Sequence, residues 1–302
     1  MLNPHRLRIL LELKHRGTIA EVAAALSYSP SAISQQLAAL SAEVQAPLLE
    51  PAGRRVRLTS HAEILVAHAT PLLQQIELAE AELAESLAGL RGTVRLATFQ
   101  TAFLGLVPRL LDLMSDRPHV SLEIVHVQPD TGFDALASYD CDLLIAEEYP
   151  GVPWPRSPEV DCVDLFRDPL RLLVPDPWQD RSARGALKAL RDAPWVMEPR
   201  GNAARAWATA LCREAGFEPD VRFESPDLLV QIRLVEIGRA VAVVPDLVWS
   251  TIAPPARLLP LATRPTRRVF TAVRAGAATH PLIALVRRRL EDVVAALPSL
   301  TS

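Results

Sequence analysis

Apolar residues near the amino terminus recur at helical spacing. Leu7 and Leu10 belong to a predicted first helix, which ends at the cationic residues before Gly17. Gly17 suits the left-handed conformation that commonly closes a helix. Thr18 is then placed to cap a second helix, with Glu21 three residues later as its capping-box partner.

A third helix is predicted to begin at Ser29, with Pro30 at the first helical position, where a missing N–H costs nothing. One face is apolar and should pack inward: it holds Ile33, Leu37, Leu40 and Val44. Short and mostly polar residues lie elsewhere near the amino end: Ser31, Ala32, Ser34, Gln35 and Gln36. Such side chains can read base edges in a helix-turn-helix, and they equally suit an ordinary solvated helix face.

The segment that follows predicts a β-hairpin with a basic tip. Arg54, Arg55 and Arg57 lie on it and are suited to gripping phosphates beside the groove that a recognition helix occupies. This hairpin favours DNA binding over the solvated-face alternative. Thr18 and Ser29, at the amino ends of the second and third helices, are further candidates for DNA contact.

Residues 60–90 predict one long helix with apolar positions at alternating spacings of four and three. The positions are Leu65, Ala69, Leu72, Ile76, Ala79, Leu83, Leu87 and Leu90. This pattern is typical of a coiled-coil seam between two copies of a chain, and a helix packed on its own domain is the alternative. Pro71 predicts a kink, or a restart of the helix near Thr70 with Thr70 as the cap.

After Gly92, predicted strands and helices alternate, which indicates parallel α/β architecture. A proline-rich break at 149–155 separates a first set of elements from a second set. A last strand at 268–273 and a helix from Pro281 then close the chain. Two α/β lobes joined by crossings would leave a cleft between them.

Charge is unevenly distributed along the 302 residues, of which 49% are hydrophobic and 22% charged. Residues 1–60 hold seven Arg and Lys against four Glu, whereas residues 61–90 hold five Glu and no Arg or Lys. An excess of positive charge in residues 1–60 is consistent with a nucleic-acid contact confined to the amino-terminal end of the protein. Neither a membrane-spanning run of roughly 20 apolar residues nor a secretory signal is evident, so we expect a soluble, cytoplasmic protein.

The sequence offers little catalytic or metal chemistry. Cys141, Cys162 and Cys212 stand apart without a C-x-x-C pair, so we expect buried or idle thiols and no zinc cluster. A P-loop, a nucleophile elbow and a dinucleotide-binding turn are all missing. Glu147 and Glu148 are adjacent, so on a strand they face opposite sides and cannot act as a pair. We expect no enzymatic activity, no metal and no cofactor.

A family resemblance now unites these features. The stretch AEVAAALSYSPSAISQQLAAL, followed by LLEPAGRRVRLT, resembles in order and spacing the helix-turn-helix and wing of the LysR-type transcriptional regulators. Ser41, Gln45 and Pro51 stand where that family usually has Glu, Gly and Arg, and His61-Ala62 replaces the usual Ala-Gly. The resemblance implies a dimerising linker helix and a two-lobed effector domain similar to periplasmic solute-binding proteins.

We therefore predict an α/β protein in three parts. These are a winged helix-turn-helix DNA-binding domain at 1–59, a linker and dimerisation helix at 60–90, and an effector-binding domain at 91–302. Lobe I of the effector domain spans about 91–160 and 266–302, and lobe II about 161–265. The resemblance implies a bacterial regulator that binds double-stranded promoter DNA as a homodimer or homotetramer and responds to a small-molecule effector.

In the family the effector lies between the lobes, held at strand-to-helix junctions. The matching positions here are Gln100, Thr101, Thr131, Arg200 and Asn202. Exposed N–H groups at helix amino ends favour an anionic effector, although plain helix capping is an equal alternative for each residue. Ala240 replaces the second glycine of a family Gly-x-Gly segment, which leaves the shape of that part of the cleft open. A solute-binding protein that stores or delivers a ligand is the rival function, and the basic head weighs against it.

Overall fold

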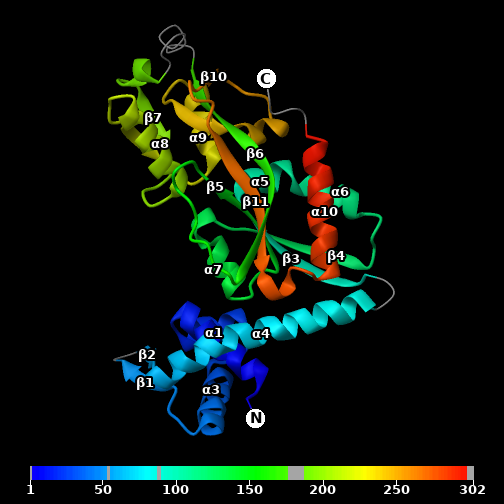
Figure 1. The fold of residues 1–302 in the computed structure, drawn as a ribbon. Helices are drawn as coiled ribbons and strands as arrows, with labels where there is room; N and C mark the ends of the chain where they lie inside the picture. The colour runs from blue at the N-terminus through cyan, green and yellow to red at the C-terminus, as the bar shows by residue number, and fades with distance from the viewer. Residues whose placement is uncertain (1, 53–54, 87–89, 176–186, 298–302) are drawn as a thin grey trace.

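The computed structural model describes residues 2–52, 55–86, 90–175 and 187–297, and it shows a small head at one end of an elongated body (Figure 1). The head comprises α1 (Pro4–Arg16), α2 (Ile19–Ala25), α3 (Pro30–Val44), β1 (Leu49–Ala52) and β2 (Arg55–Leu58). Its core is apolar and includes Leu10, Ile33, Leu37 and Leu40. The predicted helix-turn-helix and hairpin are both present.

Local capping explains why these helices begin and end where they do. Gly17 closes α1 with φ of 81°, in the left-handed region. The Thr18 hydroxyl accepts a hydrogen bond from the Glu21 backbone N–H, and the Ser29 hydroxyl accepts one from Ala32. The capping predictions for all three residues are confirmed.

The linker helix α4 (Ser60–Ser86) runs without interruption through Pro71, so the predicted restart near Thr70 is wrong. Pro71 lies on the exposed side of the helix, where water can satisfy the carbonyl group that loses its N–H partner. One face of α4 packs on α1 through buried Val66 and Ala69. Leu72 and Ile76, also part of the predicted seam, are 46% and 37% exposed.

Lobe I contains three parallel strands, β3 (Gly92–Thr98), β4 (Val120–His126) and β5 (Leu143–Glu148). Its helices are α5 (Gln100–Gly105), α6 (Val107–Met114), α7 (Gly132–Ala137) and α10 (Pro281–Ala295). The chain breaks between α5 and α6 at Leu106, because Pro108 favours the start of a new helix. The core of the lobe lies between the sheet, α6 and α10.

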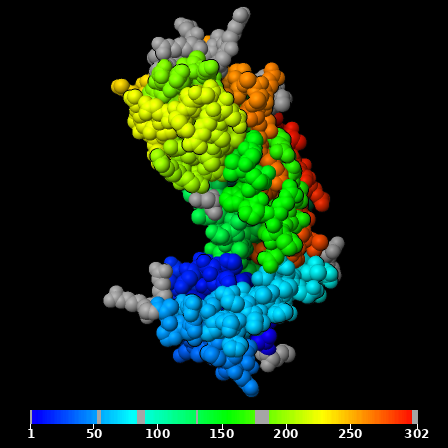
Figure 2. Space-filling view, turned by 60° about the vertical axis from the view of Figure 1, so that its left-hand side comes forward, coloured from blue at the N-terminus to red at the C-terminus, as the bar shows by residue number. Residues whose placement is uncertain are grey.

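Lobe II lies at the far end of the body from the head (Figure 2). Its elements are β7 (Pro194–Met197), α8 (Ala203–Glu214), β8 (Asp220–Glu224), α9 (Leu228–Glu236), β9 (Ala242–Pro245) and β10 (Arg257–Pro260). Ala240 is buried in a core cluster of this lobe. No described helix is long and apolar enough to cross a membrane.

Two long strands, β6 (Val160–Val174) and β11 (Thr266–Arg274), join the lobes. They pair antiparallel, because the chain leaves lobe I along β6 and returns along β11. The seven-stranded sheet is therefore mixed, and the prediction of parallel pairing holds only for β3, β4 and β5 within it. The segment LRLLVP at 170–175, which the apolar pattern predicts as a strand, covers only the last third of β6.

The head also contacts lobe I directly, with α4 crossing beneath it (Figure 1). The 3-10 turn Ala275–Ala277 lies so close to α4 that a Cβ atom on Gly276 would meet the Gln74 carbonyl oxygen at 2.3 Å. An ion pair of 2.7 Å between Arg274 and Glu77 lies beside this contact. Head, linker and lobe I thus form one continuous structure.

Candidate functional site

The amino end of α3 presents a small polar surface. Ser31, Ser34 and Gln35 are exposed, while Ala32 is half-buried. The exposed Ser34 hydroxyl donates to the Pro30 carbonyl at 2.9 Å, so its oxygen can still accept a hydrogen bond. This surface has the size and chemistry of a base-reading helix face.

Gln36 differs from its neighbours, because its side chain is occupied within the head. It is half-buried, and its Oε1 accepts a hydrogen bond of 3.0 Å from the Arg6 Nε. Arg6 also forms an ion pair with Glu43. These contacts tie α3 to α1 and orient the polar surface.

The hairpin pairs β1 and β2 with Glu50 opposite Arg57. The two side chains form an ion pair of 2.5 Å, yet the Arg57 side chain remains 75% exposed and accessible to a phosphate. Arg55 lies on β2 opposite Ala52. Arg54, also predicted to contact DNA, lies outside the described residues.

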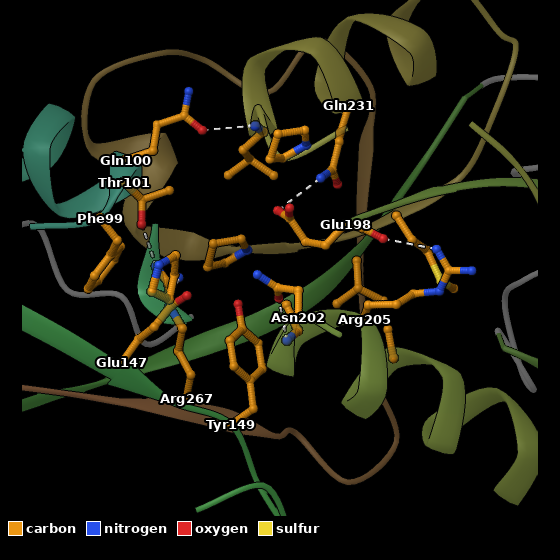
Figure 3. A pocket seen from close by; sticks show the side chains of 18 of the residues that line it. Phe99, Gln100, Thr101, Glu147, Tyr149, Glu198, Asn202, Arg205, Gln231 and Arg267 are labelled. Carbon is orange, nitrogen blue, oxygen red and sulfur yellow. Dashed lines mark hydrogen bonds and ion pairs between the residues drawn. The ribbon is translucent and has the colours of Figure 1, made fainter. Parts of the chain in front are cut away.

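A second candidate site is a cavity of about 70 Å³ between the two lobes (Figure 3). It lies where β3, β4 and β5 end, next to the amino end of α8 and to α9. The carboxyl ends of parallel strands commonly hold ligands, because the following turns and helix ends meet there. The cavity is well below the roughly 300–1,000 Å³ of pockets for drug-sized molecules.

One wall of the cavity holds a buried charge cluster centred on Arg267 of β11. The guanidinium donates to Asp168 Oδ2 at 2.9 and 2.7 Å and to the Thr101 hydroxyl at 2.6 Å. It also forms an ion pair with Glu147. Burial raises the pKa of both Glu147 and Asp168, and the charge of Arg267 opposes that rise. The cluster links α5, β5, β6 and β11 at the cavity.

The facing wall holds Glu198, directly after β7. Its Oε1 accepts a hydrogen bond of 3.0 Å from the Gln231 Nε2. Its Oε2 is buried and has no hydrogen-bond partner among the described residues. Burial, followed by the nearby charge of Glu147, raises the pKa of Glu198 to about 7. Figure 3 shows this carboxylate pointing into the cavity.

The junction residues predicted to bind an effector divide into two groups. Gln100, Thr101 and Asn202 line the cavity, whereas Thr131 and Arg200 are not among its lining residues. Asn202 caps α8 by accepting from the Ala204 N–H at 2.8 Å. Position at a junction therefore does not by itself bring a residue to the cavity.

Gln100 spans the cavity from one lobe to the other. Its Oε1 accepts from the Leu228 backbone N–H, and its Nε2 donates to Asp227 Oδ1, both at 2.8 Å. Asp227 is the cap of α9 in lobe II. The Gln100 amide is thus already used to hold the lobes together.

Most residues that line the cavity were not predicted from the sequence, and they include the polar residues Glu147, Tyr149, Glu198 and Arg267. A charged residue at the end of an apolar strand was the available signal, and Glu147 and Glu198 both follow such runs. The opposite-face prediction is confirmed, because Glu147 pairs with Arg267 whereas Glu148 contacts the Trp154 backbone N–H at 3.3 Å.

The three thiols are unreactive in character. Cys141 and Cys212 are buried, and burial raises the pKa of each to about 12. Cys162 is exposed, and desolvation still raises its pKa. Reactive cysteines require the opposite shift, toward the thiolate. Within the described chain, no group of three or more His, Cys, Asp or Glu side chains is placed to hold a metal ion.

Two family models match the chain in succession. The bacterial regulatory helix-turn-helix protein model of the lysR family matches residues 4–63, and the LysR substrate binding domain model matches residues 87–295. The first match covers the α3 surface and the hairpin. The second covers the cavity.

Individual relatives extend over most of the chain. The transcriptional dual regulator GltC of Bacillus subtilis is 27% identical and covers 82% of each chain. A probable hydrogen peroxide-inducible genes activator of Streptomyces viridosporus is 28% identical, over 94% of this chain and 95% of that protein.

Solved structures share the fold over the whole length. Full-length OxyR from Pseudomonas aeruginosa superposes with a TM-score of 0.68 at 22% identity, covering 99% of both chains. Full-length CbnR in complex with its target DNA gives 0.54 at 22% identity, covering 97% of this chain and 100% of that one.

Proposed function

The chain belongs to the LysR family of transcriptional regulators, and from this premise we propose that it binds promoter DNA as a homo-oligomer and responds to a small-molecule effector in the interlobe cavity. The family are regulators and not enzymes, with a DNA-binding helix-turn-helix and an effector-binding domain. The observation that carries the proposal is the presence in one chain of an exposed polar helix end and a polar cavity between lobes.

We assign base reading to Ser31, Ala32, Ser34 and Gln35, with Gln36 in a supporting position. Glutamine can pair with adenine through two hydrogen bonds, and serine can reach bases or phosphates. Thr18, Ser29 and the hairpin arginines Arg54, Arg55 and Arg57 would hold phosphates. The complex of CbnR with its target DNA supports this mode, because that protein shares the fold.

We propose that α4 pairs two copies of the chain. Ile64, Leu72 and Ile76 are 62%, 46% and 37% exposed, and a helix gains stability by burying such a stripe against a partner. Pairing would present two recognition helices to half-sites one helical turn, or a multiple of it, apart. The division into 1–59, 60–90 and 91–302 is part of this proposal.

The effector is proposed to lie among Gln100, Thr101 and Asn202, next to the Arg267 cluster. Small-molecule binding fits this chain better than peroxide sensing, although one relative is named a probable activator of hydrogen peroxide-inducible genes. The raised pKa values of all three cysteines keep the thiols protonated at neutral pH. The anionic effector expected from the exposed N–H groups at helix amino ends stays a prediction from the sequence.

DNA binding is tested by comparing the affinity of the purified protein for its own upstream region and for random DNA of equal length. We expect a preference of at least about 1,000-fold at physiological salt. Ser34→Ala should reduce the preference, and Ser121→Ala, an exposed serine on β4, should leave it unchanged. Equal affinity for both DNAs would refute the proposal.

A further inference from the structure

We propose that the effector presents a positively charged nitrogen to Glu198, so that the interlobe cavity is a site for a small amine or amine-bearing molecule. This inference rests on the proposed function, because it names the ligand class of the same cavity. It departs from the anion that the sequence favoured, since Arg200 does not line the cavity.

Both guanidinium groups that line the cavity already have acceptors. Arg267 is paired with Asp168 and Glu147 and also donates to Thr101. Arg205 donates to the Glu198 backbone carbonyl at 2.9 Å and pairs with Glu224 at 3.3 Å. An incoming anion would therefore have to displace existing partners to reach a cation.

Glu198 has the opposite character, because its carboxylate retains unused capacity. Gln231 donates to Oε1, whereas Oε2 is buried without a partner among the described residues. A buried acceptor that lacks a donor costs free energy, which a ligand N–H would recover. A charged donor forms a stronger hydrogen bond with a carboxylate than a neutral one does.

The rest of the cavity also suits a cation. The Arg267 cluster contains one guanidinium and two carboxylates, so it carries no excess positive charge. Tyr149 and Trp207 line the cavity as an aromatic pair, with ring centroids 5.8 Å apart. Aromatic faces attract organic cations, which adds to the effect of Glu198.

The raised pKa of Glu198 is consistent with this assignment, because an unpaired buried carboxyl group resists ionisation until a cation arrives. A bound ammonium group would lower that pKa and stabilise the carboxylate. The small volume of the cavity, about 70 Å³, favours probes of few atoms.

The test uses methylammonium and ethylammonium, with acetate and propionate as size-matched anions, in calorimetric titrations of the full-length protein. We expect both amines to bind at millimolar concentrations and at least tenfold more tightly than the anions. Glu198→Gln replaces the free acceptor with an amide and should weaken amine binding at least tenfold. Glu214→Gln, an exposed position on α8, should not change it.

Three results would overturn the assignment: no amine binding at 100 mM, equal amine binding by Glu198→Gln, or tighter binding of the carboxylates. Promoter binding by the same preparations distinguishes this failure from failure of the proposed function. A variant that still selects its promoter is folded and remains a regulator, whichever ligand its cavity takes.

Discussion

The guanidinium of Arg274 lies over the ring of Tyr139, 4.1 Å from its centroid. Arg8 of the head contacts the same ring at 4.9 Å, and Arg274 also pairs with Glu77 of the linker helix. Tyr139 therefore connects the head, the linker and lobe I through a single side chain. Tyr139 follows α7 at the edge of lobe I, so this contact lies between the lobe and the head.

Replacing Tyr139 with leucine should loosen the head from lobe I. The variant removes two cation–π contacts, each of about 0.5–2 kcal/mol, while the apolar bulk is largely kept. We expect faster hydrogen exchange in α1, measured by mass spectrometry of the full chain. Tyr28→Leu, at an exposed position of the head, is the matched control. Unchanged exchange in α1 would show that Tyr139 does not hold the head.

The buried cluster at the cavity leads to a prediction about stability. Arg267→Met should lower the free energy of unfolding by about 3–5 kcal/mol, because Glu147 and Asp168 would be left buried without their cation. Urea denaturation measures this loss. Arg268→Met is a control from the opposite face of β11, where Arg268 pairs with the exposed Asp164, and we expect a loss of about 1 kcal/mol or less. Equal losses of unfolding free energy in Arg267→Met and Arg268→Met would contradict the prediction that the buried cluster depends on its cation.

Comparing sequence with structure shows which kinds of feature are predictable. The caps at Gly17, Thr18 and Ser29 depend on residues a few positions apart, and each is present as predicted. The Arg267 cluster joins residues 99 and 166 positions apart, and no periodicity marks such pairs. Thr101 was found because it follows a predicted strand, whereas Arg267 precedes the predicted strand 268–273 and lies within the observed β11.

The linker illustrates a different limit. A proline within a helical pattern commonly ends the helix, but α4 continues because packing against α1 and the turn at Gly276 stabilises both sides of Pro71. The apolar spacing of α4 was read as one seam. In the structure, Ala69 is buried within the protein whereas Leu72 is exposed. The apolar positions of the predicted seam therefore lie on two faces of α4, one of which packs on the rest of the chain.

Pairing through α4 predicts that a charge on its exposed apolar stripe will separate the copies. Ile76→Glu should weaken self-association at least tenfold, since an unpaired carboxylate would enter an apolar interface. Sedimentation over a range of concentrations measures the change. Gln75→Glu introduces the same charge at a neighbouring exposed position. Undiminished association of the Ile76 variant would place the interface elsewhere.

The pH dependence of stability offers a test of Glu198 that needs no ligand. Its pKa rises from 4.5 to about 7 because of burial and the charge of Glu147, while Gln231 and Arg267 act in the opposite direction and Asp227 adds to the rise. Between these values the folded state holds a proton that the unfolded chain has lost. Stability due to this group is therefore full below about pH 4.5 and declines as the pH rises to about 7.

Glu198→Gln cannot ionise, so the difference in free energy of unfolding between variant and wild type should grow with pH. We expect the variant to gain about 1–3 kcal/mol relative to wild type between pH 5 and pH 8, because each pKa unit corresponds to about 1.4 kcal/mol. Urea denaturation at both pH values measures the gain. Glu214→Gln should have the same free energy of unfolding as the wild type at both pH values. A constant difference for Glu198→Gln would mean that Glu198 is ionised throughout, and the free acceptor in the cavity would then be satisfied by other means.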